Sequence, residues 1–182
     1  MRSPTDVLRD EHVVILRALS VLESAAERLA AGHAFPAGWW EDAVDWLRGF
    51  ADRNHHAKEE NVLFPAMIKA GVPSGGGPID VMLEEHEQGR ALIAQMAAGV
   101  APRRAAATRR YVQLLREHID KEHGIVFPLA EAVVAETVMQ ELSREFDTVE
   151  ATLGATASLE GAQAAVARLA AALEPAPGGR PA

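Results

Sequence analysis

Residues 55–65 read HHAKEENVLFP, and a closely matching stretch, HIDKEHGIVFP, stands at residues 118–128. Each stretch sets ionisable side chains directly ahead of a short apolar run that ends in Phe-Pro. Both contain a His followed four residues later by a Glu: His55 with Glu59, and His118 with Glu122. Residues four apart lie on one face of an α-helix, so each His points the same way as its Glu.

A Glu-His pair precedes each stretch, Glu11-His12 in the first half of the chain and Glu85-His86 in the second. Each half therefore supplies a lone His on one helix, then a His and a Glu on the next. A bundle built from two such halves would have pseudo-twofold symmetry about its axis.

The composition favours helices and excludes several kinds of partner. A chain of 182 residues suits one sizeable domain. Hydrophobic residues make up 48% of it but aromatic residues only 5%, a balance that suits helices better than sheets. The net charge of −8 argues against a nucleic acid or an anionic membrane as partner. Cysteine is absent, so any metal would have nitrogen and oxygen ligands.

The N-terminus gives no sign of export. Its first twelve residues, MRSPTDVLRDEH, are charged and lack the apolar core of a signal peptide. No run approaches the roughly 20 apolar residues of a membrane span. We therefore expect a cytoplasmic protein.

Helical periodicity, interrupted by Gly- and Pro-rich loops, divides the chain into a bundle and an extension. We expect bundle helices over residues 7–31, 39–70, 79–99 and 102–135, and weaker helices over 137–153 and 159–173. Short connections predict an all-α, up-down-up-down four-helix bundle in residues 1–135. Residues 136–173 would form a helical extension packed on the bundle, and residues 174–182 a disordered tail. Pro65 and Pro128 should kink or break their helices.

The ionisable residues of the repeat share their helix faces with apolar residues. Six polar side chains should therefore point into one core: His12, His55, Glu59, His86, His118 and Glu122. A buried carboxylate must be paired, protonated or bound to a cation. Arg90, one turn after His86, is the only basic residue near these faces, so a metal is the simplest partner. Carboxylates can bridge two ions while imidazoles supply nitrogen.

Simpler explanations account poorly for the whole pattern. A lone His on an apolar face is usually a hydrogen-bonded core residue, and one His-Glu pair could be a surface ion pair. Two pairs at matching places in a repeat, each on an apolar face, favour a metal site.

Four further residues are candidates for the surroundings of the site. Tyr111 lies two turns before His118 and could donate a hydrogen bond to an oxygen-containing ligand, or simply pack in the core. His56 and Glu60 lie about 100° further round their helix, facing sideways or to solvent. His123 has apolar neighbours and is the better candidate of these for a ligand.

The combined pattern resembles the hemerythrin-like HHE cation-binding domains over about residues 5–135. The resemblance implies a four-helix bundle with a non-haem di-iron centre, bridged by carboxylates and an oxo or hydroxo group. It also implies His12, His55, His86 and His118 as terminal iron ligands. Glu59 and Glu122 would then be the bridging carboxylates. Oxygen-carrying hemerythrins are similar but place a second His where this chain has Arg90, and an acid where it has His123.

The resemblance implies a protein that binds or turns over dioxygen, peroxide or nitric oxide, and leaves open whether it is an enzyme. The alternative is a metal- or redox-responsive sensor or interaction module without turnover, in which the C-terminal helices respond to the site. Those helices could equally cap the bundle or form a homodimer surface. Ferritin-like oxidases use Glu-x-x-His pairs, which this repeat lacks, and structural zinc sites favour four ligands.

Overall fold

The computed structural model describes residues 2–154 and 158–174 and is built of helices in these ranges. The bundle contains α1 (Pro4–Ala30), α2 (Trp39–Trp46), α3 (Phe64–Lys69), α4 (Pro78–Ala98), α5 (Ala101–Lys121) and α6 (Phe127–Val133), together with three π-helical segments, η1 (Leu47–His56), η2 (Glu59–Leu63) and η3 (Glu122–Val126). The extension contains α7 (Glu136–Leu153) and α8 (Leu159–Ala171). The predicted all-α bundle with C-terminal helices is confirmed.

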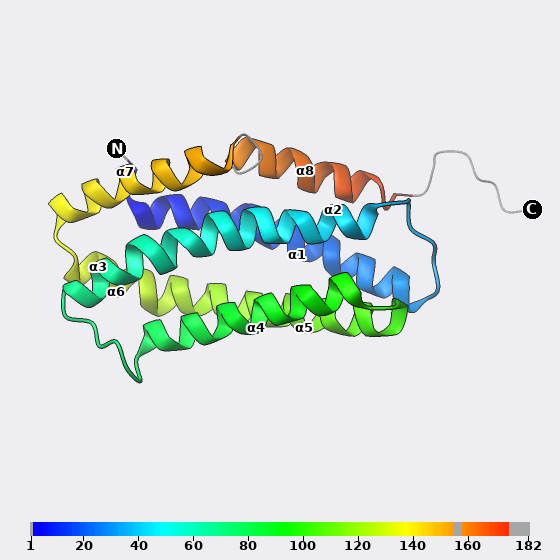
Figure 1. Ribbon diagram of the computed structural model, residues 1–182, viewed down its shortest axis with the longest axis horizontal. Helices are drawn as coiled ribbons and strands as arrows, with labels where there is room; N and C mark the ends of the chain where they lie inside the picture. The colour runs from blue at the N-terminus through cyan, green and yellow to red at the C-terminus, as the bar shows by residue number, and fades with distance from the viewer. Residues whose placement is uncertain (1, 155–157, 175–182) are drawn as a thin grey trace, which may run out of the picture.

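The four long arms of the bundle run side by side in alternating directions (Figure 1). The second arm runs from α2 through η1 and η2 into α3, and the fourth from α5 through η3 into α6. In Figure 1, α7 and α8 lie along one side of the bundle, over the first two arms and away from α4. α7 contacts α1, η1 and η2, and α8 contacts α1 and α2. The extension therefore covers one half of the duplicated bundle.

Local sequence signals fix the ends of the first arm. Pro4 opens α1, where its missing N–H costs nothing, and the Ser3 hydroxyl accepts a hydrogen bond from the backbone N–H of Asp6. After α1 the chain turns through Gly32 and Gly38, both with φ near +80°. Glycine adopts this left-handed conformation without steric cost.

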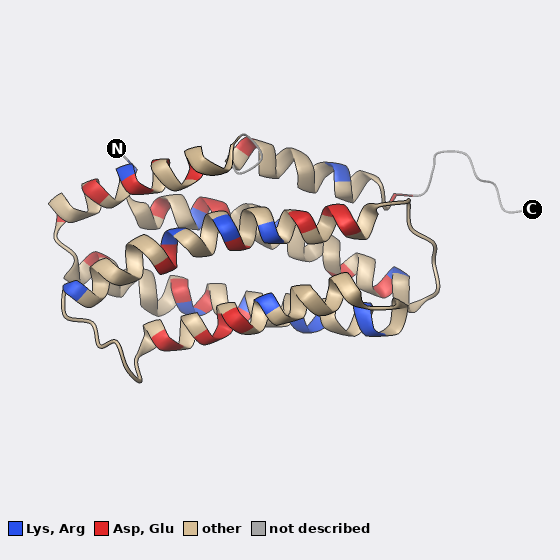
Figure 2. Ribbon diagram, in the orientation of Figure 1, with Lys and Arg blue, Asp and Glu red and all other residues tan. Residues whose placement is uncertain are grey.

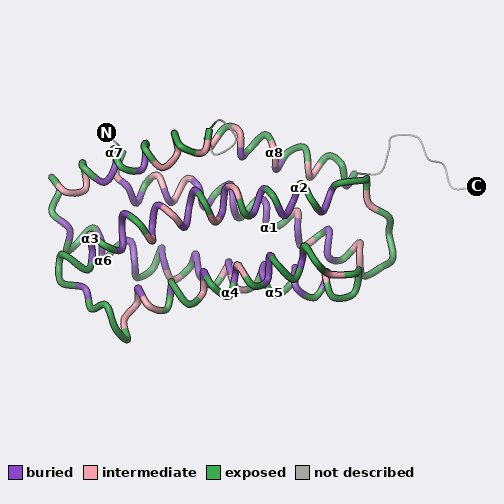
Figure 3. Tube along the Cα trace, in the orientation of Figure 1, coloured by how far each residue is buried: buried purple, intermediate pink, exposed green. Residues whose placement is uncertain are grey.

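Two apolar clusters fill the bundle, and the polar residues of the repeat lie between them. One cluster includes the three tryptophans and continues into α8 through Ala162 and Val166. The other surrounds Phe64 and Phe127 and continues into α7 through Leu142 and Phe146. In Figure 3 buried and exposed residues alternate along the bundle helices, as expected for helices with one inward face. Apolar packing on both sides thus holds a buried polar layer in place.

The two prolines do not end their helices. Pro65 and Pro128 stand in the first turns of α3 and α6, directly after the wide π turns of η2 and η3. Of the predicted kink or break, a break does not occur, since each arm is helical on both sides of its proline and a first-turn position requires no N–H from the ring nitrogen. Apart from Glu174, the predicted tail lies outside the described residues.

The surface carries both signs of charge, interspersed along the bundle helices (Figure 2). Within the described part of the chain, no helix combines the length and apolar character that crossing a membrane requires.

Candidate metal centre

Four arms of the bundle each deliver imidazole or carboxylate groups to the same buried layer. α1 carries His12, η1 ends with His55 and His56, and η2 begins with Glu59. α4 carries His86, α5 carries His118, and η3 begins with Glu122. All six predicted ligands are at most 1% exposed. π-helical turns are rare and frequently mark functional sites, and here each of the two Glu residues opens one.

The four predicted histidine ligands form two pairs that face each other through their Nε2 atoms. The Nε2 atoms of His12 and His55 are 2.9 Å apart, and those of His86 and His118 are 3.1 Å apart. Such close approach of ring nitrogens, with the rings at steep angles to each other, suits imidazoles that share a metal ion. The sequence repeat is thus reproduced as two equivalent imidazole pairs.

Each carboxylate extends one oxygen toward each pair. Glu122 places Oε2 3.1 Å from His12 Nε2 and Oε1 3.2 Å from His118 Nε2. Glu59 places Oε1 3.9 Å from His55 Nε2 and Oε2 3.4 Å from His86 Nε2. Two groups of ligand atoms that could each hold an ion result, and Glu59 belongs to both: His12, His55, Glu59 and Glu122, and His56, Glu59, His86 and His118.

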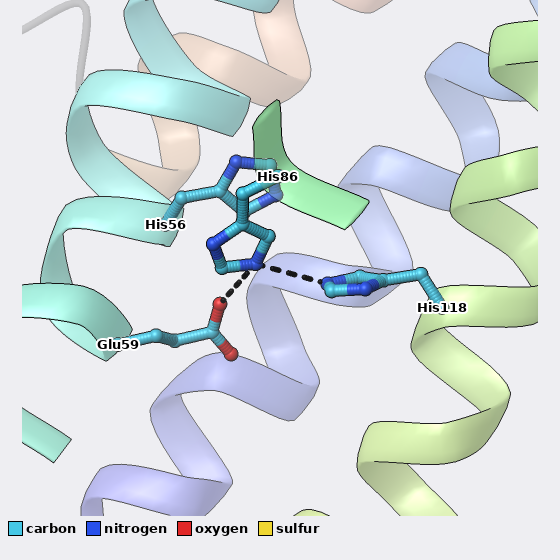
Figure 4. Close-up of side chains that lie close together, drawn as sticks. All are labelled: His56, Glu59, His86 and His118. Carbon is cyan, nitrogen blue, oxygen red and sulfur yellow. Dashed lines mark hydrogen bonds and ion pairs between the residues drawn. The ribbon is translucent and has the colours of Figure 1, made fainter. Parts of the chain in front are cut away.

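Figure 4 shows the second group, with His86 Nε2 directed at both Glu59 and His118. The ring of His56 stacks on that of His86, with 3.8 Å between centroids and 14° between planes. Its Nδ1 lies 3.7 Å from an Asp52 oxygen. Although expected to face sideways or to solvent, His56 is buried at 3% exposure. The structure therefore excludes a surface role for this histidine.

The unpaired oxygens of Glu59 fit a metal better than they fit an apolar core. Within residues 2–154 and 158–174, neither oxygen has a hydrogen-bond partner. Burial, and next the neighbouring Glu122 carboxylate, raise the pKa of Glu59 well above its usual value of 4.5. A pair of carboxylates in a dry layer needs protons or cations to balance its charge. Metal ions are the balancing charge that the surrounding imidazoles would accept.

The histidines respond differently to their surroundings. Burial and the neighbouring His12 lower the pKa of His55 to about 4. Burial also opposes protonation of His118, but Glu122 and Glu85 outweigh it and raise the pKa of His118 to about 9. His118 in turn offsets the effect of burial on Glu122, whose pKa lies well below 4.5. In the metal-free protein, His118 and Glu122 form a buried ion pair that a metal ion would replace.

The outward nitrogen of every predicted His ligand has a partner. His55 Nδ1 donates to Glu11 Oε2 over 2.8 Å, and His118 Nδ1 donates to Glu85 Oε2 over 2.9 Å. His86 Nδ1 donates to Glu60 Oε1 over 2.6 Å. A proton held on Nδ1 leaves the Nε2 lone pair free, which fixes the ring for metal ligation. Each Nε2 atom therefore points into the interior of the site.

The partner of His12 is another imidazole. His12 Nδ1 lies 2.8 Å from His123 Nε2. In the sequence repeat His123 corresponds to Glu60, so the two halves use different groups at one equivalent place. The structure puts His123 and Glu60 behind two of the predicted ligand histidines, His12 and His86, where they orient the rings.

Sequence analysis missed the roles of two acids and two lysines. Glu11 also accepts hydrogen bonds from Lys58 and, over 3.0 Å, from Asn54. Glu85 accepts a hydrogen bond from Lys121. Lys58 is fully buried, which contradicts the expectation that no basic residue other than Arg90 would approach the site. The signal was present in the repeat, since each lysine stands three residues after its ligand histidine.

Tyr111 and Arg90 complete the surroundings. Tyr111 is fully buried, and its hydroxyl has no hydrogen-bond partner among the described residues. Burial, then the charge of Asp52, raise its pKa. Arg90 donates hydrogen bonds to Asp52, Glu60 and Glu87 over 2.6–2.8 Å. Arg90 therefore holds these three carboxylates outside the buried layer of predicted metal ligands.

Comparison with known proteins agrees with this geometry. The hemerythrin HHE cation-binding domain matches residues 3–130 of the chain. The chain belongs to the hemerythrin HHE cation-binding family. Membership implies iron binding, and the His and Glu groups just described are those able to hold it. At the position where the sequence comparison with oxygen carriers expects a second His, this hemerythrin-like chain has Arg90. The Arg90 guanidinium contacts three carboxylates.

Several relatives are similar to this hemerythrin-like chain. The uncharacterized protein Rv1995 of Mycobacterium tuberculosis is 25% identical over 158 residues, which cover 81% of this chain and 61% of the relative. The iron-sulfur cluster repair protein DnrN of Neisseria gonorrhoeae is 33% identical over 66% of this chain and 85% of its own length. The iron-sulfur cluster repair protein YtfE of Escherichia coli O81 is 38% identical over 42% of this chain and 40% of its own. No solved structure shows significant similarity to the chain.

Proposed function

We propose that this hemerythrin-like chain holds two iron ions and binds or turns over a small oxygen species: dioxygen, peroxide or nitric oxide. The decisive observation is the arrangement of the two carboxylates. Glu122 places one oxygen near His12 and the other near His118, and Glu59 places one near His55 and the other near His86, at 3.1–3.9 Å from the ring nitrogens. A carboxylate shared in this way is the natural bridge between two ions.

Iron bound there would supply open coordination positions for a small ligand and would exchange electrons with that ligand. The protein itself supplies exclusion of water, because every predicted ligand is at most 1% exposed. It also supplies orientation, because the Nδ1 atoms are held from behind. A site this enclosed suits diatomic or peroxide-sized ligands, which supports small oxygen species as the partners.

Tyr111 is the best candidate to hold such a ligand by hydrogen bonding. Its buried hydroxyl is unpartnered in the described structure, and a buried donor gains most from an acceptor that arrives with the ligand. The side chain packs beside Gly89, one turn after His86. This places it on the side of the site that contains His86 and His118.

The test begins with metal content. Protein loaded anaerobically with ferrous iron should contain about two irons per chain and, after exposure to air, show oxo-to-iron charge-transfer absorption. Peroxide and nitric oxide are then added separately, and the loss of each is followed together with the visible spectrum. Absence of bound iron would refute the proposal.

A matched pair of variants separates the site from the rest of the protein. Glu59→Gln removes a bridging oxygen, whereas Glu117→Gln alters an exposed carboxylate of α5. We expect the first variant to lose iron and turnover and the second to keep both. Equal iron content in the two variants would contradict the assignment of Glu59.

A second candidate function, a metal-responsive module without turnover, is favoured by one specific contact. Lys58 reaches both Glu11, behind a ligand histidine, and Glu150 of α7. Two bound irons without loss of peroxide or nitric oxide, but with a metal-dependent change in oligomer size, would support this candidate. A homodimer formed through the extension is the partner proposed in that case.

The relatives named for iron-sulfur cluster repair support iron chemistry in the same family. Cluster repair itself is a role of those proteins by name. For this chain it is one of the processes that a small-molecule-reactive iron site could serve, and the peroxide and nitric oxide assays are the first step in testing it.

A further inference from the structure

Lys58 is the feature that the proposed function leaves unexplained. Its side chain is fully buried, which is rare for lysine unless the charge is paired. The Nζ atom donates to Glu11 and lies 3.5 Å from Oε2 of Glu150, with the Phe146 ring 5.9 Å away. Phe146 and Glu150 both belong to α7. A helix of the extension therefore encloses a charge that belongs to the bundle.

The same charge connects α7 to a ligand histidine. Glu11 accepts from Lys58 through Oε1 and from His55 Nδ1 through Oε2. The series of contacts from Glu150 through Lys58 and Glu11 to His55 is continuous, and each of its hydrogen bonds and ion pairs has a carboxylate as one partner. Charge-assisted hydrogen bonds in a buried setting are stronger than neutral ones and hold their geometry closely.

The second half of the repeat provides an internal comparison. Lys121 corresponds to Lys58 and pairs with Glu85, which holds His118 Nδ1. Its side chain, however, is 38% exposed, whereas that of Lys58 is 0% exposed. The two halves thus share the lysine, the acid and the histidine, and differ in the cover that α7 adds to one of them.

We propose that α7 acts as a latch on the His12 and His55 half of the metal centre. Docking of α7 and metal binding at that half stabilise each other through Lys58, while the His86 and His118 half depends less on α7. This inference rests on the proposed function, since it requires metal at the site. Coupling between two sites is reciprocal: if metal tightens α7, then a docked α7 tightens the metal to the same degree.

Loosening α7 would weaken the contacts that lead from Glu150 to His55. Lys58 would gain water, its bond to Glu11 would weaken, and His55 would lose its fixed orientation. Loss of a residue that hydrogen-bonds a metal ligand typically lowers metal affinity by about 10–100-fold. Glu150, which touches neither metal nor ligand, is a positioning residue in this scheme.

Hydrogen exchange of the full chain, with and without Co²⁺ as a probe, tests the latch. Binding of Co²⁺ should slow exchange of α7 amides about tenfold, within the usual range of coupling between sites. Lys58→Met should abolish this slowing in α7. The matched variant Lys121→Met should retain it, which also excludes a simple stabilisation of the whole fold.

Glu150→Gln provides a second, milder variant, since its side chain is 38% exposed. We expect it to weaken Co²⁺ binding about tenfold at one of two positions, seen as a split in the titration followed by visible absorption. Arg144→Gln, an exposed change in the same helix, is the control and should leave the titration unchanged.

The outcomes separate the latch from the proposed function. Two bound ions with unaltered α7 exchange, or equal behaviour of Lys58→Met and Lys121→Met, would overturn the latch and leave the metal centre intact. Failure of the unmodified protein to bind Co²⁺ or iron at all would overturn the proposed function together with the latch.

Discussion

Replacing one or the other of the two carboxylates proposed as bridges, Glu122 or Glu59, with its amide should affect the metal-free protein in opposite directions. Glu122 has a cationic partner in the metal-free site, because it contacts the protonated His118. Glu59 has no protonated partner of this kind, and burial and Glu122 both oppose its ionisation. We therefore expect Glu122→Gln to destabilise the metal-free protein and Glu59→Gln to stabilise it.

The size of the first effect follows from His118. Raising its pKa from 6.5 to about 9 corresponds to about 3 kcal/mol of preference for the charged ring. Glu122 and Glu85 share this contribution, so removal of one carboxylate should cost about 1–2 kcal/mol. For a chain of this length each kcal/mol lowers Tm by about 2–4 °C.

The size of the second effect follows from the proton that Glu59 must keep. An unfolded carboxyl group with a pKa of 4.5 is ionised near neutrality, whereas the folded one resists ionisation. Holding that proton at about pH 7.5 costs at most about 4 kcal/mol. The glutamine amide is itself unpartnered, so the net gain in unfolding free energy should be about 1–3 kcal/mol.

Thermal unfolding followed by far-ultraviolet circular dichroism, with and without Co²⁺, measures both effects. Metal at about 100 times its Kd should stabilise the unmodified protein by about 2.7 kcal/mol, and both variants should lose most of this gain. Shifts of the same sign in the two metal-free variants would refute the electrostatic argument. Full metal stabilisation of either variant would refute the bridging role.

Two further predictions concern the same site, and a third concerns the packing of α7. Because the pKa of His118 is raised from 6.5 to about 9, the metal-free protein should lose stability as pH rises between these values. Glu59, whose pKa is raised, adds to this loss as pH rises above 4.5. Co²⁺ binding between pH 6.5 and about 9 should release protons, as calorimetry in buffers of different ionisation enthalpy will show. Tyr111→Phe removes an unpartnered buried hydroxyl, so it should raise the unfolding free energy by about 1 kcal/mol while slowing any ligand turnover; a loss of stability would mean that the hydroxyl is paired. Phe146→Ala should cost about 3–5 kcal/mol in urea unfolding, because the ring is 2% exposed between α7 and the bundle; a cost near zero would show that α7 is not docked.

The parts of the structure that sequence could predict depend on periodicity and repetition. Apolar spacing located the helices to within a few residues, since one face of each is buried between neighbours. The repeated His-x-x-x-Glu pairs identified four residues that the structure brings into one layer, because residues four apart share a helix face, and the two lone histidines of the repeat, His12 and His86, completed the set. These inferences needed only the geometry of a single helix.

The parts that sequence did not reveal depend on which helices touch. Lys58 looks like an ordinary solvent-facing lysine until α7 is placed beside η1 and η2. Burial of His56 likewise results from stacking on His86, a residue of another helix. π-helical turns form where backbone hydrogen bonds join residues five apart, and no short sequence motif predicts where this happens. Contacts between distant segments therefore account for the misses.

The wide turns η2 and η3 have a consequence for the ancestry of the fold. Both begin at a glutamate of the repeat, Glu59 or Glu122, and end just before a Phe-Pro pair, so they occupy the same place in each half of the chain. A half-length polypeptide with one such helix pair would already carry two imidazoles, the carboxylate and the supporting lysine. Two identical copies related by a twofold axis would rebuild the whole ligand set. After fusion the copies could diverge, so that α7 covers the lysine of one half and the lysine of the other half stays partly exposed.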